Sequence, residues 1–137
     1  MKALIILTLL LICGCDDPAY SEEITTEKAV SCILGESRGE GKIGIEAMAQ
    51  ALRNRGTVTG VFGCGADFSK ELAYIKAKGL DVIARNAWLA GKNDLVHGAD
   101  HWGGVQVDGK WIAKMRKSGF IQTAKIGNTV FYKGVKK

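Results

Sequence analysis

Two apolar repeats with helical spacing, one directly after the other, most constrain what this chain can fold into. In residues 25–40, small or apolar side chains recur every three or four positions, which predicts a helix with one face toward a core. Residues 45–55 repeat the pattern, and a glycine-rich loop over residues 39–44 is expected between them. Gly56 can end the second helix in the left-handed conformation. The apolar positions are Ala29, Cys32 and Ile33, then Ile45, Met48, Ala49 and Leu52.

The rest of the chain changes from helical to extended patterning. Residues 69–79 and 81–91 each begin with a capping side chain and end at glycine, which predicts two further helices with Leu72 and Ile75 facing inward in the first. Residues 105–112 and 121–132 alternate around Asp-Gly and Gly-Asn pairs, which indicates two β-hairpins, with a short helical turn over residues 112–117 between them. In a chain of 137 residues, this order predicts one α+β domain, mainly helical in its first half, with short hairpins in its second.

Glu36 stands out because it continues the apolar face of the first helix. It follows Ala29, Cys32 and Ile33 at the next position of the same stripe. A carboxylate at the edge of a core resists ionisation, because desolvation disfavours its charged form. A glutamic acid that keeps its proton near neutral pH is suited to general acid catalysis. The alternative is a glutamate at a frayed helix end that points into water.

Three segments together resemble a known family. Residues 32–40 end in Glu-Ser-Arg-Gly-Glu, residues 44–55 end in Asn-Arg, and residues 123–133 contain Ile-Gly-Asn-Thr-Val-Phe-Tyr. In this order they resemble the cell wall hydrolase family typified by the spore-cortex-lytic enzyme SleB, over residues 29–133. The resemblance implies a compact lysozyme-like domain that cuts the glycan strands of peptidoglycan, with Glu36 as the catalytic acid.

The resemblance also implies residues for a substrate groove. Residues 98–102, Gly-Ala-Asp-His-Trp, resemble a family segment that reads Gly-Ala-Thr-His followed by Tyr or Trp, with aspartate in place of threonine. His101 and Trp102 are therefore expected to line the groove. Tyr132, in the closing motif, is expected to hydrogen-bond near the catalytic acid, and Glu40 to contact substrate. Core packing is the alternative for Trp102 and Tyr132, and it is the expectation for Trp111. Arg55 is expected to hold the end of its helix, with a place in the groove as the alternative.

The number of carboxylates bears on the reaction. Most glycosidases use two acids. Lytic transglycosylases need one, because the substrate's own hydroxymethyl oxygen attacks the anomeric carbon and leaves a 1,6-anhydromuramyl end. No second acid occupies an obvious partner position here, which favours that route at the bond between N-acetylmuramic acid and N-acetylglucosamine. A true muramidase would recruit Glu40, Asp67, Asp100 or Asp108. Neither route needs a cofactor, and the alternative outside enzymes is a wall-binding lipoprotein without turnover.

The first residues resemble an export signal. Lys2 precedes a short apolar run, and Ile12-Cys-Gly-Cys15 resembles a bacterial lipobox with a lipid on Cys15. An ordinary secretory leader is the alternative. We expect an exported lipoprotein, anchored in a membrane and facing the periplasm or the cell wall. Its parts would be a signal peptide at 1–14, an anchor and tether at 15–24 and a cell wall hydrolase domain at 25–137.

The charge and the motifs restrict the partners. A net charge of +5 suits an anionic polymer such as the bacterial wall. The basic residues form no single run and no nucleic-acid-binding motif is present in the sequence, so nucleic acid is not expected. The expected partners are peptidoglycan strands and, through the lipid, a membrane, and the protein is expected to be a monomer.

Besides the proposed anchor, the processed chain keeps two cysteines, Cys32 and Cys64. Export permits a disulfide, so they can pair, or they can remain two buried thiols. Together with His97 and His101 they could in principle hold zinc. The cysteines lack the close spacing of zinc ligands and the histidines lie on no clear helix, so no metal site is expected.

Overall fold

The computed structural model describes residues 23–135, which form a mixed α+β fold of helices and one three-stranded antiparallel sheet. The expected signal peptide and Cys15 lie outside the described residues. Within the described range, no helix is both long and apolar enough to cross a membrane. In chain order the elements are α1 (Thr26–Ser37), α2 (Gly41–Arg55), the 3-10 helix η1 (Phe62–Gly65), α3 (Leu72–Ala77), α4 (Leu80–Leu89), β1 (His101–Gly104), α5 (Gly109–Lys117), β2 (Ile121–Ile126) and β3 (Thr129–Lys133).

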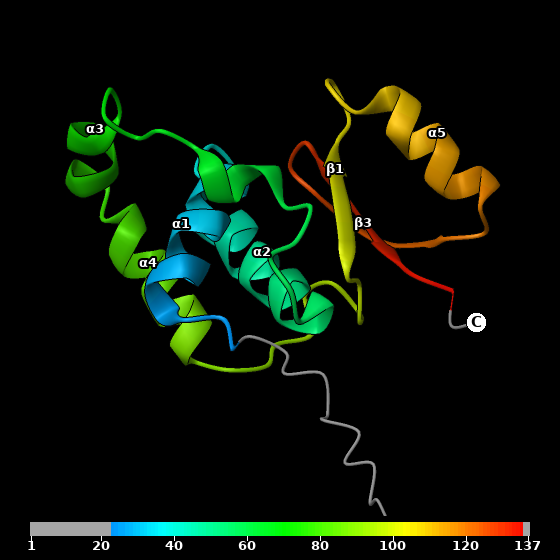
Figure 1. Ribbon diagram of the computed structural model, residues 1–137, viewed down its shortest axis with the longest axis horizontal. Coiled ribbons are helices and arrows are strands. Elements are labelled where there is room, and N and C mark those ends of the chain that lie inside the picture. The colour runs from blue at the N-terminus through cyan, green and yellow to red at the C-terminus, as the bar shows by residue number, and fades with distance from the viewer. Residues whose placement is uncertain (1–22, 136–137) are drawn as a thin grey trace, which may run out of the picture.

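The helices and the sheet occupy two sides of the molecule. Figure 1 shows α1 to α4 on one side, and the sheet with α5 on the other. The strand order is β1-β3-β2, and both pairs are antiparallel. The expected hairpin over residues 121–132 is confirmed, with Gly127 at a positive φ of 56° in its turn. The first strand of the sheet, β1, was not predicted as a strand.

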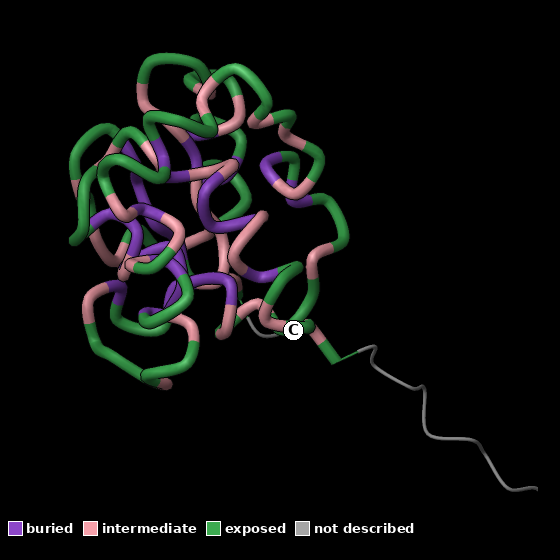
Figure 2. The backbone as a smooth tube through the Cα atoms, turned by 90° about the vertical axis from the view of Figure 1, so that its left-hand side faces the viewer, coloured by how far each residue is buried: buried purple, intermediate pink, exposed green. Residues whose placement is uncertain are grey.

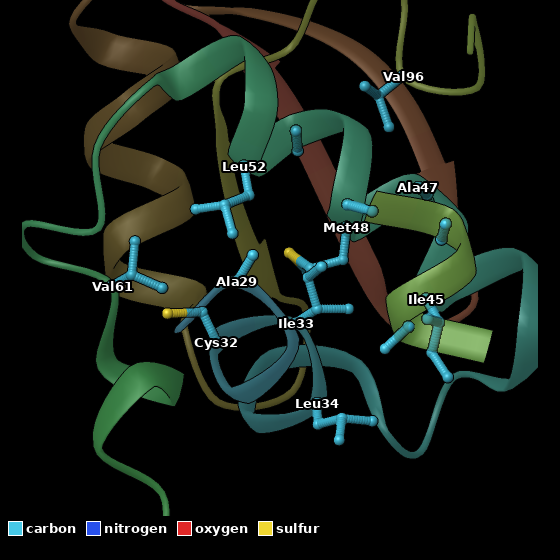
Figure 3. Packing of buried hydrophobic residues seen from close by; sticks show 14 of the residues in the cluster. Ala29, Cys32, Ile33, Leu34, Ile45, Ala47, Met48, Leu52, Val61 and Val96 are labelled. Atoms are coloured by element: carbon cyan, nitrogen blue, oxygen red, sulfur yellow. The ribbon is translucent and has the colours of Figure 1, made fainter. Parts of the chain in front are cut away.

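The main core lies among the helices. Both apolar repeats are buried there, and Figure 3 shows Ala29 and Ile33 of α1 facing Met48 and Leu52 of α2. In Figure 2 the buried segments run through the interior, enclosed by exposed turns. A second, smaller cluster of Ile112, Val130 and Tyr132 lies between α5 and the sheet. The fold therefore has two apolar centres, with β1 and β3 between them.

The ends of the first two helices follow their sequence signals. The Thr25 hydroxyl caps α1 by accepting a hydrogen bond from the backbone N–H of Lys28, at 3.2 Å. Gly56 ends α2 with a φ of 71°. The expected loop over residues 39–44 was too long, because α2 already begins at Gly41. Gly44 is buried in its first turn, where an added Cβ would lie 2.2 Å from the Cβ of Glu40.

The third and fourth helices form as expected, with shifted ends. α3 begins at Leu72, and Ile75 is buried, but Leu72 itself is 48% exposed and does not face the core as predicted. α4 begins at Leu80, after Gly79 reverses the chain with a φ of 64°. These two helices cover the edge of the main core.

The expected hairpin over residues 105–112 is wrong. Residues 109–117 instead form α5, and the carbonyl of Asp108 accepts the backbone N–H of Ile112 at 2.8 Å. Ile112 and Met115 are its buried positions, three residues apart, which is a helical interval. Asp-Gly is a common hairpin turn, but here it opens a helix that packs on the sheet.

Candidate functional site

Glu36, in the last turn of α1, accepts hydrogen bonds on both carboxylate oxygens. The backbone N–H of Gly63 in η1 donates to Oε1 at 2.6 Å. The indole N–H of Trp102 in β1 donates to Oε2 at 3.0 Å. The side chain is partly buried, as its place at the end of the apolar stripe predicted. Each oxygen has two lone pairs, so these bonds fix the carboxyl group and still leave positions for a proton.

The contact between α1 and η1 depends on two glycines and a disulfide. A Cβ on Gly35 would lie 1.9 Å from the carbonyl oxygen of Gly63, and a Cβ on Gly63 would lie 2.7 Å from the backbone nitrogen of Glu36. One turn earlier in α1, Cys32 forms a disulfide with Cys64. The disulfide was one of the two alternatives that the sequence left open. It covalently holds the Gly63 N–H next to the carboxylate.

The end of α2 positions β1, and with it Trp102. The Asn54 amide donates to the carbonyl of Ala99 at 2.8 Å, and the Arg55 guanidinium to the carbonyl of Asp100 at 3.5 Å. The guanidinium carbon also lies 5.9 Å from the centre of the Trp102 ring. The Asn-Arg pair at the end of α2 therefore anchors the segment that leads into β1.

Two pockets meet at Glu36. They share Glu36, Trp102 and Asp108, and we call them the Arg55 pocket, of about 180 Å³, and the Glu40 pocket, of about 320 Å³. The Arg55 pocket is also lined by Arg55, Gly60, Val61, Phe62, His101, Gly103 and Trp111. The Glu40 pocket is also lined by Gly35, Glu40, Gly104, Gln106, Val107, Asn128 and Thr129. Together they form a groove with a fixed carboxylate at its middle.

His101 lines the Arg55 pocket, as the sequence predicted, and Asp100 orients its ring. His101 Nδ1 lies 2.8 Å from Asp100 Oδ1, which also accepts the Gly134 backbone N–H at 2.9 Å. Burial alone would raise the pKa of Asp100, but the hydrogen bonds from His101 and Gly134 and the charge of His101 hold it below its ordinary value. An ionised carboxylate only accepts, so His101 Nδ1 is the donor in this contact.

Glu40 lies in the groove and Tyr132 does not. Glu40 lines its pocket, and its Oε2 accepts the backbone N–H of Asn128 at 3.0 Å. Tyr132 is fully buried in the second core cluster, where its hydroxyl accepts a hydrogen bond from Arg116 Nε at 3.2 Å. The expected hydrogen bond of Tyr132 near Glu36 is therefore wrong, because α5 covers the sheet face on which Tyr132 lies.

Asp108 is an aspartate that the structure places in the groove with Glu36 and Glu40. It lines both pockets, and its Oδ2 accepts the backbone N–H of Gly104 at 2.7 Å. Asp67 is exposed and accepts the backbone N–H of Ser69, which lowers its pKa, and it lines neither pocket. Asp100 is hydrogen-bonded to the ring of His101 and is not among the residues that line either pocket. Of the aspartates considered from the sequence, Asp108 alone lines the two pockets that contain Glu36.

The sequence did not single out three further groove residues. Phe62 precedes Gly63 on the rim of the Arg55 pocket and is 94% exposed, which is unusual for a phenylalanine. For Arg55 the sequence favoured a role at the helix end over a place in the groove, and the structure shows both. Trp111 was expected in the core, and it lines the pocket while packing under Gly103. A signal for Phe62 was present in its neighbours, since Gly63 and Cys64 indicate a tightly packed turn.

A larger pocket elsewhere is a weaker candidate. It has a volume of about 600 Å³ beside α2 and α4 and includes Glu46, whose carboxylate lies 3.7 Å from the exposed Lys42 amine.

For metals, the disulfide removes Cys32 and Cys64 as thiolate ligands. Among residues 23–135, no three His, Cys, Asp or Glu side chains gather closely enough to hold an ion.

Comparisons with known proteins identify no relative of this chain. No protein-family model, no curated protein and no solved structure matches this chain.

Proposed function

We propose that this protein cleaves peptidoglycan glycan strands at the bond between N-acetylmuramic acid and N-acetylglucosamine, by a lytic-transglycosylase route with Glu36 as acid and base. We also propose that the helical half and the small sheet together form a lysozyme-like domain. The observation that carries the proposal is a partly buried glutamate, fixed by two N–H donors, at the meeting point of two pockets. A polymer strand can lie through both pockets and pass the carboxyl group.

The proposed reaction uses one carboxyl group twice. Protonated Glu36 gives its proton to the glycosidic oxygen as the bond to the anomeric carbon of muramic acid breaks. The hydroxyl on C6 of the same sugar then attacks that carbon, and the Glu36 carboxylate accepts the hydroxyl proton. The products are a free glucosamine hydroxyl and a 1,6-anhydromuramyl end, and Glu36 regains its proton. Water takes no part in the step.

The test compares the full-length protein with Glu36→Gln on isolated peptidoglycan, with the soluble fragments analysed by mass spectrometry. We expect anhydromuramyl ends from the wild type and none from the variant. Glu46→Gln is the matched control, because it makes the same chemical change in a partly exposed carboxylate outside the groove and should keep full activity. Fragments released equally by Glu36→Gln would refute the role of Glu36.

A muramidase is the second candidate, and the position of Asp108 favours it. A second acid that lines the same two pockets as Glu36 could activate a water molecule or stabilise the oxocarbenium-like state. In that case the fragments would carry reducing muramic ends, heavier than anhydro ends by one water. Asp108→Asn would then abolish release, whereas a transglycosylase would keep part of its activity. If neither the wild type nor any variant releases fragments, the remaining candidate is a wall-binding protein without turnover.

We further propose that the protein is exported and lipid-anchored at Cys15. The Cys32–Cys64 disulfide supports export, because structural disulfides persist in oxidising compartments. The anchor rests on the sequence of the leader, which lies outside the described residues. Incorporation of labelled fatty acid into the wild type, lost in Cys15→Ser, is the expected result. Label retained by Cys15→Ser would refute the anchor site.

A further inference from the structure

The two pockets that flank Glu36 differ in charge. Both pockets contain the carboxylates of Glu36 and Asp108, and the Arg55 pocket is also lined by the guanidinium group of Arg55 and by His101. The Glu40 pocket adds the carboxylate of Glu40 to the same two, and no Lys, Arg or His belongs to the residues that line it. An anionic sugar is therefore accommodated better on the Arg55 side of the groove than on the Glu40 side.

Arg55 is held in place without being neutralised. Its Nη2 donates to the carbonyl of Thr59 at 2.9 Å and its Nη1 to the carbonyl of Asp100 at 3.5 Å. Within the described residues, no carboxylate forms an ion pair with it. Two carbonyl bonds fix the group and leave further N–H donors on the two terminal nitrogens. A guanidinium group in this state is preorganised to bind a carboxylate.

The two sugars of the proposed substrate differ in the same property. N-acetylmuramic acid carries a lactyl group on O3, which ends in a carboxyl group, and N-acetylglucosamine has a neutral hydroxyl there. The Arg55 pocket has a volume of about 180 Å³ and includes Glu36 among the residues that line it. A muramyl residue placed in it can direct its O3 substituent toward Arg55 while its glycosidic oxygen faces Glu36.

We propose that Arg55 recognises a carboxylate on the muramyl side chain, an inference that rests on the proposed function. The muramyl residue of the cleaved bond then lies in the Arg55 pocket and the glucosamine in the Glu40 pocket. This fixes the direction in which the strand crosses the groove. The favoured source of the carboxylate is the lactyl group of strands that have lost their peptide stems, because that carboxylate lies closest to the sugar ring.

The test measures binding in Glu36→Gln, so that no turnover interferes. The ligands are the tetrasaccharide of alternating glucosamine and muramic acid with free lactyl carboxylates, and the same tetrasaccharide with these groups converted to methylamides. By calorimetry we expect about tenfold tighter binding of the free acid, a factor that corresponds to about 1.4 kcal/mol. Arg55→Gln in the same background should abolish the preference. The ratio of two affinities from one preparation does not depend on the folded fraction.

Arg53→Gln is the matched control. Arg53 lies in the same last turn of α2, but its guanidinium donates to the carbonyl of Trp88 and stacks on that ring at 4.8 Å, away from the groove. It should keep the tenfold preference. A preference that survives Arg55→Gln, a preference lost equally in Arg53→Gln, or no binding of either ligand would overturn the inference.

A third ligand separates the two sources of the carboxylate. In a tetrasaccharide with alanine-glutamate stems the lactyl carboxyl group is an amide, so the favoured source predicts binding as weak as that of the methylamide. Binding as tight as that of the free acid, and dependent on Arg55, would place the recognised carboxylate in the stem and still support a muramyl side-chain carboxylate. Wild-type cleavage is assayed separately. An Arg55-dependent preference without cleavage would refute the proposed reaction and leave the binding inference standing.

Discussion

Removal of the Cys32–Cys64 disulfide is the perturbation with the most direct structural magnitude. The bond joins residues 32 apart in sequence and so restricts the unfolded chain. The chain-entropy relation for a loop of that length gives about 4 kcal/mol of stabilisation at 25 °C. We therefore expect Cys32→Ala combined with Cys64→Ala to lose about 4 kcal/mol in the free energy of unfolding, a large part of the stability of a domain of this size.

The assay is urea unfolding, followed by tryptophan fluorescence. With a slope of about 2 kcal/mol per molar urea, the midpoint should fall by about 2 M. Reduced wild-type protein is the matched control, because it lacks the bond and keeps both sulfur atoms, so it separates the cross-link from the small loss of packing at the buried Cys32. A loss below about 1 kcal/mol in both proteins would refute the reasoning that this bond restricts the unfolded chain.

Three further changes test the groove and its support. Trp102→Phe keeps an aromatic ring but removes one of the two donors to Glu36, so kcat/KM on glycan strands should fall about tenfold, the equivalent of about 1.4 kcal/mol; unchanged kinetics would contradict the role of the indole N–H. Phe62→Ala should leave the free energy of unfolding within about 0.5 kcal/mol, because the ring is 94% exposed, and should weaken strand binding about threefold to tenfold in calorimetry. The folded pKa of Asp100 lies below its ordinary value of 3.8, so its contribution to stability is present above that pH and is lost as the pH falls through the folded pKa. Thermal melts between pH 5 and 2 should therefore decline less steeply for Asp100→Asn than for the wild type, and parallel curves would contradict the lowered pKa.

The elements with a strong local pattern were predictable from the sequence. α1 and α2 follow from long apolar repeats with capping signals, and the β2–β3 hairpin follows from alternation around Gly127 and Asn128. For α5 the sequence indicated only a short helical turn over residues 112–117, because Asp-Gly suits both a tight turn and the start of a helix. The neighbouring residues Trp111 and Ile112 are compatible with the apolar pattern of a strand and with that of a helix. Packing against the sheet selects the helix.

The site was predictable only where a side chain carries the signal. Glu36 interrupts an apolar stripe and Trp102 lies in a motif, and the structure brings the two together. The other donor is the backbone N–H of Gly63. Nearly every residue has this group, so the type of a residue does not predict which carboxylate its backbone will contact. The error at Tyr132 has the same origin as the error at α5, since α5 is the helix that buries this ring.

The two donors to Glu36 also make its carboxyl group observable in solution. One is a glycine amide and the other an indole N–H, which resonate in separate, sparsely populated regions of a proton–nitrogen NMR spectrum. Each proton lies along a hydrogen bond to a different carboxylate oxygen, at donor–acceptor distances of 2.6 and 3.0 Å. A proton or a sugar that arrives at one oxygen changes the two signals unequally. The chain therefore contains a pair of natural probes that report from which side its central carboxyl group is approached.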